Sequence, residues 1–361
     1  MSKCPYCHFA SEGLTGAGLR AWREGLKKEA GAADGLGETP GLCFDTLYIG
    51  GGTPSLLGPD EVAAVRGLAE GRFAADIAEF TLEANPGGRR EGFLGGWRDA
   101  GVTRLSVGVQ SFDDGVLQTL GRPYSADEAL AFCRAGREAG FEALAFDLIT
   151  GIPGETPESA ERTVRTLLGC EPDHVSVYFL ENVEGLPFED VLRRRPVDED
   201  ASVETFLRIR DALELAGLRQ YEISNFARPG KACRHNLKYW RYEPFYGLGP
   251  SACSHVGLRR WSNKPSLAAW SEALERGEAP RDEVVELDPA RAAREALIFG
   301  LRLVEGVDLA ALGERFGVDL FALCGRAIDE LAAEALLVRT GDRLRIPRDK
   351  LLVSNSILSR L

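Results

Sequence analysis

The stretch Asp99-Ala100-Gly101-Val102-Thr103-Arg104-Leu105-Ser106-Val107-Gly108-Val109-Gln110 decides the predicted fold of this chain. It reads as the end of a helix, a glycine in the left-handed conformation, and a strand over residues 104–109. The apolar character of this strand suits one that is covered on both faces. Two further segments repeat the pattern of helix end, glycine and next strand: Glu138-Ala139-Gly140-Phe141 and Leu215-Ala216-Gly217-Leu218. The repetition predicts parallel βα units.

Five strands are expected in the first two-thirds of the chain, over residues 45–50, 79–84, 104–109, 143–149 and 174–180. Helices with recognisable ends separate them. Ser125 and Glu128 predict a capping box that opens a helix closed by Gly140. Thr156 can cap another helix, with Pro157 in its first turn and Gly169 after it. A sixth strand would have to precede Cys4, so we expect an α/β fold, a partial barrel that lacks its first strand.

The composition limits the cellular location and the partners that can be expected of this protein. The chain has 361 residues, 44% of them apolar, and a formal net charge of −12. It contains no run of eighteen apolar residues and no basic-plus-apolar start, so we expect a soluble, unexported protein of the cytoplasm. Its negative field would repel a nucleic-acid backbone, and no nucleic-acid partner is expected. Its remaining cysteines lack disulfide-framework spacing and are interpreted as free thiols: Cys43, Cys133, Cys170, Cys233, Cys253 and Cys324.

The last third of the chain follows a different pattern. After about residue 225 the βα rhythm stops, and loops rich in aromatic residues and glycine follow. From Pro289 we expect helix through Gly306 and beyond, and then a hairpin over 337–347 around Thr340-Gly341-Asp342. Helices followed by a hairpin are typical of a winged-helix module. Because of the acidic balance, packing or contact with a partner is a better interpretation of this module than nucleic-acid binding.

Near the start, Cys4-Pro5-Tyr6-Cys7 is a C-x-x-C pair whose spacing leaves its role open. It matches the redox motif of glutaredoxins, and with His8 it could form half of a zinc site. It also fits the last two cysteines of a C-x3-C-x2-C iron–sulfur loop. On that interpretation the first cysteine lies one position before Met1, the start is displaced, and the chain keeps two of three cluster ligands.

Polar residues follow several of the expected strands. Gly50-Gly51-Gly52-Thr53-Pro54-Ser55 lets a ligand approach bare backbone and lacks the lysine of a phosphate-binding P-loop. Glu83, Gln110 and Asp147 lie at the ends of the next strands. A barrel places the carboxyl ends of its strands at one mouth, so we expect these groups to converge there. For one carboxylate alone, capping a turn explains it equally well.

Six motifs together make the chain recognisable: C-P-Y-C-H-F, G-G-G-T-P-S, G-V-Q-S-F, L-G-R-P-Y, D-L-I-T-G-I-P-G and His235-Asn236-Leu237-Lys238-Tyr239-Trp240. They resemble the radical S-adenosylmethionine superfamily and, within it, the HemW heme chaperones, which are similar to oxygen-independent coproporphyrinogen III oxidases. The resemblance covers essentially the whole chain. The H-N-x-x-Y-W block is its specific part, because it separates the chaperones from the true oxidases. Phe9 agrees, since the oxidases usually carry another cysteine there.

The resemblance implies a [4Fe–4S] cluster bound by Cys4 and Cys7, and S-adenosylmethionine beside it. The residues that it implies around S-adenosylmethionine are Tyr6, Gly51, Gly52, Thr53, Glu83, Gln110, Arg122 and Asp147. A guanidinium fork at Arg122 would match a carboxylate. The plain alternative is a surface arginine at a helix end.

For heme, the resemblance implies a binding site in the H-N-x-x-Y-W block. His235 suits an axial position on iron, and Tyr239 and Trp240 could stack on the macrocycle. The alternative is that His235 satisfies buried backbone groups in an aromatic core. His255 and Cys233 are rival ligands.

The resemblance therefore implies a heme chaperone with two domains, a partial radical-SAM barrel over 1–225 and a mainly helical HemN-type C-terminal domain over 226–361. Its expected partners are heme and respiratory heme-accepting proteins, with a homodimer and peripheral membrane contact through those partners as further expectations. Two other functions stay open. One is a radical enzyme that decarboxylates a porphyrinogen in porphyrin biosynthesis, and the other is a thiol redox protein that uses Cys4 and Cys7.

Overall fold

The computed structural model describes residues 4–8, 13, 15–35, 41–87 and 90–361, so the expectations for Met1 and Phe9 concern residues outside the described part. The chain forms two compact units. The first contains the described residues up to 15, residues 41–220 and residues 224–232. The second contains residues 16–35, 221–223 and 233–361.

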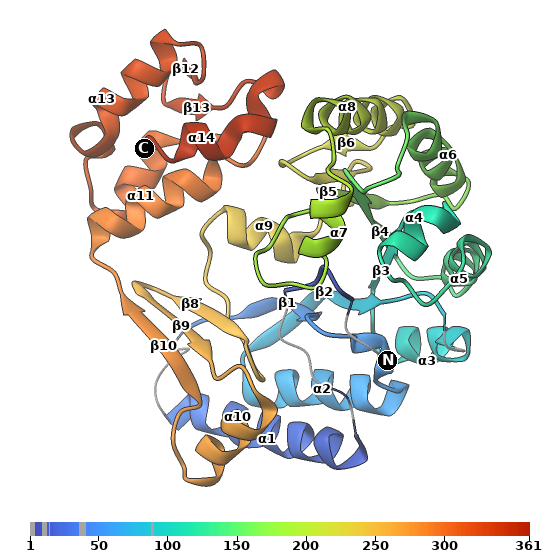
Figure 1. The fold of residues 1–361 in the computed structure, drawn as a ribbon. Coiled ribbons are helices and arrows are strands. Elements are labelled where there is room, and N and C mark those ends of the chain that lie inside the picture. The colour runs from blue at the N-terminus through green and yellow to red at the C-terminus, as the bar shows by residue number, and fades with distance from the viewer. Residues whose placement is uncertain (1–3, 9–12, 14, 36–40, 88–89) are drawn as a thin grey trace. The chain divides into compact units, whose positions relative to one another are not determined.

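A seven-stranded sheet forms the centre of the first unit (Figure 1), in the order β1-β2-β3-β4-β5-β7-β6. Neighbouring strands from β1 to β5 are parallel, and β7 pairs antiparallel with both β5 and β6. The sheet is open, with β1 and β6 at its edges. Its strands are β1 (Phe44–Ile49), β2 (Ala75–Ala84), β3 (Arg104–Gln110), β4 (Ala143–Thr150), β5 (His174–Phe179), β6 (Arg219–Gln220) and β7 (Asn225–Ala227).

The five strands expected from the sequence are confirmed, and so is the α/β class. Every residue of β3 is buried, as its apolar character predicts. The third glycine repeat has a different outcome, because Gly217 leads into β6, a two-residue strand that pairs antiparallel. The chain leaves the first unit over residues 221–223 and returns as β7, which pairs antiparallel with both β5 and β6.

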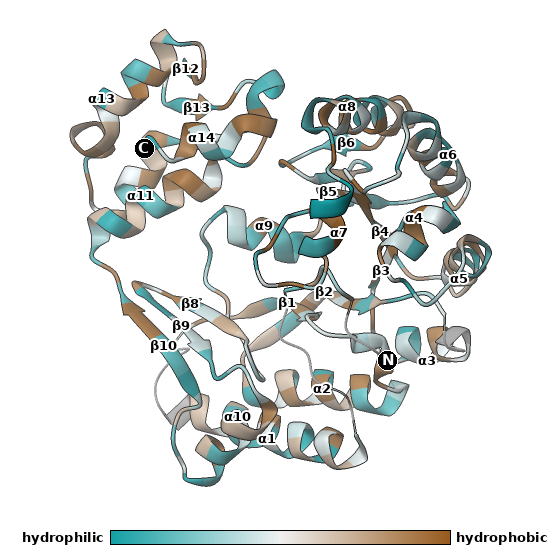
Figure 2. Cartoon of the chain, viewed as in Figure 1, coloured by the Kyte–Doolittle hydropathy of each residue, from teal (hydrophilic) through white to brown (hydrophobic). Residues whose placement is uncertain are grey.

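Helices connect the strands of this unit, and α5, α6 and α8 lie along one face of the sheet (Figure 1). Figure 2 shows that α6 and α8 mix hydrophobic and hydrophilic residues, whereas β4 is mainly hydrophobic. The helices are α2 (Pro59–Arg72), α3 (Leu94–Asp99), α4 (Asp114–Thr119), α5 (Ala126–Glu138), α6 (Pro157–Leu168), α7 (Glu189–Arg194) and α8 (Glu199–Leu215), with 3-10 turns at Pro54–Leu56 and Arg90–Phe93.

The helix ends follow the local signals. The Ser125–Glu128 capping box opens α5, and Thr156 caps α6 in a box with Ser159. Gly101, Gly140 and Gly217 have φ of 95°, 80° and 86°, the left-handed conformation predicted for the three repeats. A glycine tolerates this conformation because it has no Cβ to clash with the backbone.

The second unit combines helices with two small antiparallel sheets, in the orders β10-β9-β8 and β11-β13-β12. Its strands are β8 (Cys253–Val256), β9 (Arg259–Asn263), β10 (Arg281–Glu286), β11 (Val307–Asp308), β12 (Val338–Thr340) and β13 (Arg343–Arg345). Its helices are α1 (Gly16–Gly35), α9 (Arg234–Trp240), α10 (Leu267–Glu275), α11 (Pro289–Gly300), α12 (Leu309–Phe316), α13 (Leu320–Ala333) and α14 (Ser354–Leu358), with a 3-10 turn at Arg348–Val353. The β8–β10 sheet is not among the elements expected from the sequence.

The C-terminal part has its own hydrophobic core, formed by α11, α12, α13 and the β12–β13 hairpin. The expected hairpin is confirmed, and Gly341 in its turn has φ of 62°. The expected helix through Gly306 is too long, because α11 ends at Gly300 and turns follow to residue 306. A Cβ on Gly306 would lie 2.1 Å from the Leu344 carbonyl oxygen, so the chain there needs a residue without a side chain.

One buried carboxylate fastens α1 inside the second unit. Glu29 accepts hydrogen bonds from the Gly249 amide (2.8 Å), the Asn263 side-chain amide (2.6 Å) and the Trp270 indole (3.2 Å). Burial raises the pKa of Glu29 to about 7, against the effect of these donors. A Cβ on Gly25 would lie 2.1 Å from the Trp270 ring, so this glycine permits the close approach of α1 and α10.

Among the described residues, no helix combines the length and the apolar composition needed to span a membrane.

Candidate functional site

The cysteine pair lies in a tight turn at the start of the first unit. The Cys7 amide donates to the Cys4 carbonyl oxygen at 3.1 Å. Between the two cysteines, Tyr6 packs edge-on against Phe188, with ring centroids 6.1 Å apart. The Phe188 amide donates to the Pro5 carbonyl oxygen (3.2 Å), and burial raises the pKa of Tyr6. The turn is thus seated on a small apolar cluster and presents two half-buried thiols.

Arg122 connects this turn to the strands. Its Nη1 donates to Cys4 Sγ (3.0 Å), and its Nη2 donates to Asn85 Oδ1 (2.9 Å) and to the Gly108 carbonyl oxygen (2.8 Å). Its Nε donates to the Tyr124 hydroxyl (2.7 Å), which in turn donates to the Gly108 carbonyl oxygen (2.7 Å). Burial raises the pKa of Tyr124 to about 12, although the Arg122 charge opposes the shift. Arg122 is therefore a planar fork committed to several acceptors, not a surface arginine at a helix end.

Three polar groups gather over the bare backbone of Gly108. A Cβ at this position would lie 2.8 Å from Gln110 Nε2, 3.0 Å from Asn85 Oδ1 and 3.1 Å from Arg122 Nη2. Only glycine leaves these groups room to converge. The structure thus brings Gln110 and Arg122 together, and Asn85 joins them from the end of β2.

Glu83 links β2 to the glycine turn. Its carboxylate accepts from the Tyr48 hydroxyl (2.8 Å) and from the Gly51 amide (3.0 Å). Gly51 has φ of 106°, a conformation that few other residues adopt. Burial raises the pKa of Glu83, and the two hydrogen bonds oppose the shift. Gly52 and Thr53 follow directly in the same turn, between β1 and the 3-10 turn at Pro54–Leu56.

Asp147 lies on β4, opposite Ser176 of β5 in the sheet register. The Ser106 hydroxyl donates to Asp147 Oδ2 at 3.4 Å. Burial raises the pKa of Asp147 to about 6, hydrogen bonds from Ser176 and Ser106 oppose this, and the nearby Glu83 charge adds to it. Two neighbouring carboxyl groups with raised pKa values are typical of a functional site.

These contacts join the cysteine turn, the glycine turn and the ends of β2, β3 and β4. The convergence of the acids with Gln110 that the strand order predicts is therefore seen in the structure. Five residues of this arrangement were not predicted from the sequence: Tyr48, Asn85, Ser106, Tyr124 and Ser176. Asn85 lies two residues after Glu83, and Tyr124 lies in the L-G-R-P-Y motif, so their positions beside predicted residues were the available signal.

The other three predicted site residues lie in the second unit, on α9. His235 Nε2 and the Tyr239 hydroxyl are 2.9 Å apart, and the two rings are perpendicular. Residues four apart share one face of a helix, which explains the pairing. Trp240 packs instead against Phe299, with Arg302 over its ring at 5.6 Å. His235 and Trp240 therefore belong to different faces of α9.

The carboxyl end of α9 is held by the C-terminal helices. Arg315 of α12 donates to the carbonyl oxygens of Arg241 (2.9 Å) and Tyr242. Tyr242 is buried, has φ of 54°, and donates its hydroxyl proton to Glu295 Oε2 of α11 (2.7 Å). A residue other than glycine adopts this conformation only when its surroundings stabilise it. These contacts supply that stabilisation.

The rival heme ligands are less available than His235. His255 is 4% exposed, its Nε2 lies 3.1 Å from the Gly257 carbonyl oxygen, and it packs on Tyr242 at 4.3 Å. Burial lowers the pKa of His255. The Cys233 thiol is also buried, with 3% exposure. His235 is only half-buried, which leaves part of it accessible to a ligand.

The first unit offers thiols that suit an iron–sulfur cluster, and a guanidinium and carboxyl groups that suit a small ligand with both acidic and basic groups. Thiol sulfurs are the usual ligands of such clusters, and hydrogen bonds to the sulfurs tune them. Cys4 and Cys7 supply two sulfurs, and Arg122 donates to one of them. No group of three or more His, Cys, Asp or Glu side chains within the described ranges is arranged to hold a metal. In the described part of the cysteine turn, Cys4 and Cys7 are thus two free thiols that such a cluster could use.

Comparison with known proteins gives two family matches and the same fold. The Radical SAM superfamily model matches residues 1–167, and the HemN C-terminal domain model matches residues 287–350. The solved structure of coproporphyrinogen III oxidase (HemN) from Escherichia coli, a radical SAM enzyme, has a TM-score of 0.81 and covers 99% of this chain and 87% of that one. At 22% identity this likeness shows the fold alone.

Curated relatives share nearly the full length. The heme chaperone HemW of Mycobacterium tuberculosis is 32% identical over 100% of this chain and 92% of its own length. HemW of Bacillus subtilis is 27% identical over 98% and 94%, and HemW of Escherichia coli is 36% identical over 71% and 68%. Membership of the radical SAM superfamily implies a [4Fe–4S] cluster and S-adenosylmethionine. On this identity, coverage and fold, the chain belongs to the HemW family of radical S-adenosylmethionine proteins.

Proposed function

We propose that this protein is a heme chaperone, which binds heme and delivers it to respiratory proteins from a scaffold that binds a [4Fe–4S] cluster and S-adenosylmethionine. The relatives named heme chaperones span nearly the whole chain and support this function. The observation that carries the proposal is the partial exposure of His235. It is half-buried and bonded to Tyr239, while the competing His255 and Cys233 are buried.

In this proposal α9 supplies the heme site. His235 is the axial ligand, since an imidazole suits heme iron. Tyr239, on the same face of α9, is the ring that contacts the macrocycle beside it. Trp240 packs on another face of α9 against Phe299. That Trp240 also stacks on the macrocycle stays a prediction of this proposal.

The first unit supplies the second part of the proposal. Cys4 and Cys7 would hold the cluster, and the residues around S-adenosylmethionine would be Tyr6, Gly51, Gly52, Thr53, Glu83, Gln110, Arg122 and Asp147. When bound, the cluster supplies an electron to the sulfonium of S-adenosylmethionine. The chain's own residues bind and orient: Arg122 offers a guanidinium to a carboxylate, the glycine turn offers backbone N–H groups, and the acids accept from hydroxyl or amino groups.

The test is a heme titration of the anaerobically reconstituted chain, followed through its Soret band. We expect a saturable Soret shift that is lost in His235→Ala and retained in Lys238→Ala, a change to a charged residue on the same helix. Tyr239→Phe should keep the axial ligand and alter the position of the band. No Soret shift, or one that His235→Ala leaves unchanged, would contradict the heme site.

The same preparation distinguishes the other functions. Formation of 5′-deoxyadenosine and protoporphyrinogen from a porphyrinogen substrate would favour the decarboxylating enzyme. Glutathione-dependent disulfide reduction by the iron-free chain would favour a thiol redox protein. The domain boundary at residue 225, the homodimer, the respiratory acceptors and contact with a membrane through them remain predictions of this proposal, as does a location in the cytoplasm.

A further inference from the structure

Gln110 occupies an unusual backbone conformation. Its φ is 67°, and the Ser111 amide donates to the Val109 carbonyl oxygen at 2.8 Å, two residues back. A hydrogen bond of this span around a residue with positive φ is a γ-turn of the rare, strained kind. The β3–β4 register also shifts between Gly108 and Gln110, so β3 bulges at the same point. Something outside the strand must stabilise this turn.

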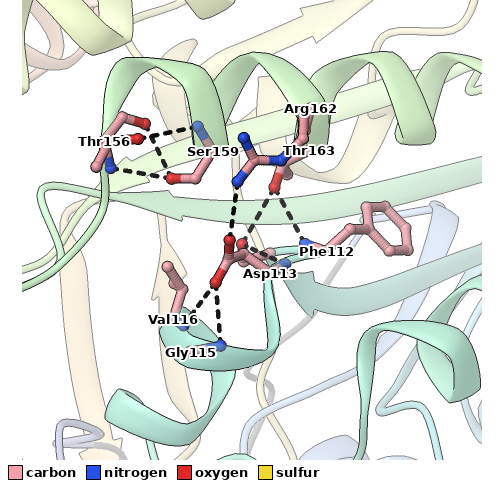
Figure 3. Close-up of polar contacts among 9 residues, drawn as sticks. Phe112, Asp113, Gly115, Val116, Thr156, Ser159, Arg162 and Thr163 are labelled. Atoms are coloured by element: carbon pink, nitrogen blue, oxygen red, sulfur yellow. Dashed lines mark hydrogen bonds and ion pairs between the residues drawn. The ribbon is translucent and has the colours of Figure 1, made fainter.

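The stabilising contacts come from α6 (Figure 3). Thr163 Oγ1 accepts from the Phe112 amide (3.1 Å) and lies 3.1 Å from the Ser111 hydroxyl oxygen. The Ser111 hydroxyl oxygen itself accepts from the Asp113 amide (3.2 Å). Thr163 and Ser111 are 5% and 3% exposed, so little water competes for these bonds.

The next residue extends the network to α4. Asp113 Oδ1 accepts from the amides of Gly115 and Val116 and so caps α4. Its Oδ2 is paired with Arg162, the neighbour of Thr163 on α6 (Figure 3). After α4 the chain turns at Gly121, whose φ is 67°, and reaches Arg122. One side of α6 thus holds the start of the segment from Gln110 to Arg122, at residues 111–113.

We infer that Thr163 is a positioning residue for the S-adenosylmethionine site: through Ser111 and Phe112 it holds the strained turn that directs Gln110 towards the Arg122 side chain over Gly108. The inference rests on the proposed cofactor site and adds a residue on α6 that belongs to none of the recognised motifs. Gln110 Nε2 and Arg122 Nη2 are both about 3 Å from the point where a Gly108 Cβ would lie. A relaxed turn would move Gln110 out of this cluster.

The test uses Thr163→Val, which keeps the shape of the side chain and removes its oxygen. The Phe112 amide then loses its acceptor, and the Ser111 hydroxyl loses its hydrogen bond to Thr163. We expect faster hydrogen exchange across 110–122 in the chain without cofactors, and a Kd for S-adenosylmethionine raised about tenfold in the reconstituted chain. Thr163→Ser restores the oxygen and should bring both quantities back to within about twofold of the original.

Thr205→Val is the matched control. Thr205 is also 5% exposed in a helix, and its hydroxyl donates to the Ala201 carbonyl oxygen of α8. It should change thermal stability without changing exchange at 110–122 or the Kd. If Thr163→Val leaves the exchange unchanged, or speeds exchange with an unchanged Kd, the positioning role is wrong. If the original chain binds no S-adenosylmethionine, the proposed scaffold fails and this inference fails with it.

Discussion

Arg122 Nη1 lies 3.0 Å from Cys4 Sγ, so the cysteine turn is joined directly to a residue 118 positions later. The same guanidinium bonds to Asn85 and to the Gly108 carbonyl oxygen, at the ends of two strands. Through these hydrogen bonds Arg122 connects the cysteine turn to the carboxyl ends of β2 and β3. A change at Arg122 therefore affects the cysteine turn and the ends of β2 and β3 together.

Arg122→Lys should weaken both the fold and the site. A lysine ammonium is a point charge and cannot reproduce the planar fork, so several of the four acceptors lose their donor. We expect the free energy of unfolding of the first unit to fall by about 2–3 kcal/mol, and S-adenosylmethionine binding to weaken with it. Urea unfolding and equilibrium dialysis measure the two effects. Arg326→Lys, at a 94% exposed arginine side chain on α13, should change neither quantity. Equal effects in both variants would contradict the proposed role of the Arg122 hydrogen bonds.

Asp147 predicts a pH dependence of stability with a definite sign. Its pKa is raised from the ordinary value to about 6, so the folded chain holds the proton more tightly than the unfolded chain. The resulting destabilisation is absent below the unfolded pKa of about 4, grows as the pH rises, and is complete above pH 6, at about 2–3 kcal/mol.

Asp147→Asn removes this titration. The variant should gain stability relative to the original chain as the pH rises from 4 to 7, which urea unfolding at these two values would measure. Asp76→Asn changes an exposed aspartate in β2 and should show no such trend. A difference between Asp147→Asn and the original chain that stays constant with pH would show that this carboxyl does not titrate in the range.

Glu29→Gln should destabilise the second unit. All three partners of Glu29 are donors, and a glutamine would turn its own N–H groups towards at least one of them. We expect a loss of about 1–3 kcal/mol in the free energy of unfolding. Tryptophan fluorescence suits the measurement because Trp270 is one of the donors. Glu24→Gln changes an exposed residue on the same helix and should alter the free energy of unfolding by less than about 0.5 kcal/mol. An equal loss in Glu24→Gln would show that the buried hydrogen bonds of Glu29 contribute no particular stability.

Tyr242→Phe tests how α9 is held. The variant keeps the ring that packs on His255 and loses the hydroxyl bond to Glu295. The strained backbone at residue 242 then has one contact fewer, so we expect a loss of about 1–2 kcal/mol in the free energy of unfolding and weaker heme binding. Soret titration and thermal unfolding measure the two. Tyr178→Phe alters a tyrosine that is 42% exposed on β5 and serves as the control. If heme binding is unchanged in Tyr242→Phe, the way in which the end of α9 is held does not affect the heme site.

The sequence alone determined the βα rhythm and the places where functional groups gather. Strand positions follow from short apolar runs, and helix ends follow from local signals such as Ser125 with Glu128 or the glycines at 101, 140 and 217. These are short-range effects, because capping and left-handed glycines depend on residues a few positions apart. The rule that parallel strands end at one edge then suffices to bring Glu83, Gln110 and Asp147 together.

Tertiary structure decided which groups contact one another and which conformations are held. The Arg122–Cys4 bond, the Glu29 network and the Thr163–Phe112 bond join residues 51 to 241 positions apart, and no local pattern encodes such pairs. The pairing of β5 with β7 and of β9 with β10 depends likewise on residues far apart in the chain. The faces of α9 are the clearest case: Tyr239 and Trp240 are adjacent in sequence, yet the helix turns one to His235 and the other to Phe299, because successive residues of a helix point about 100° apart.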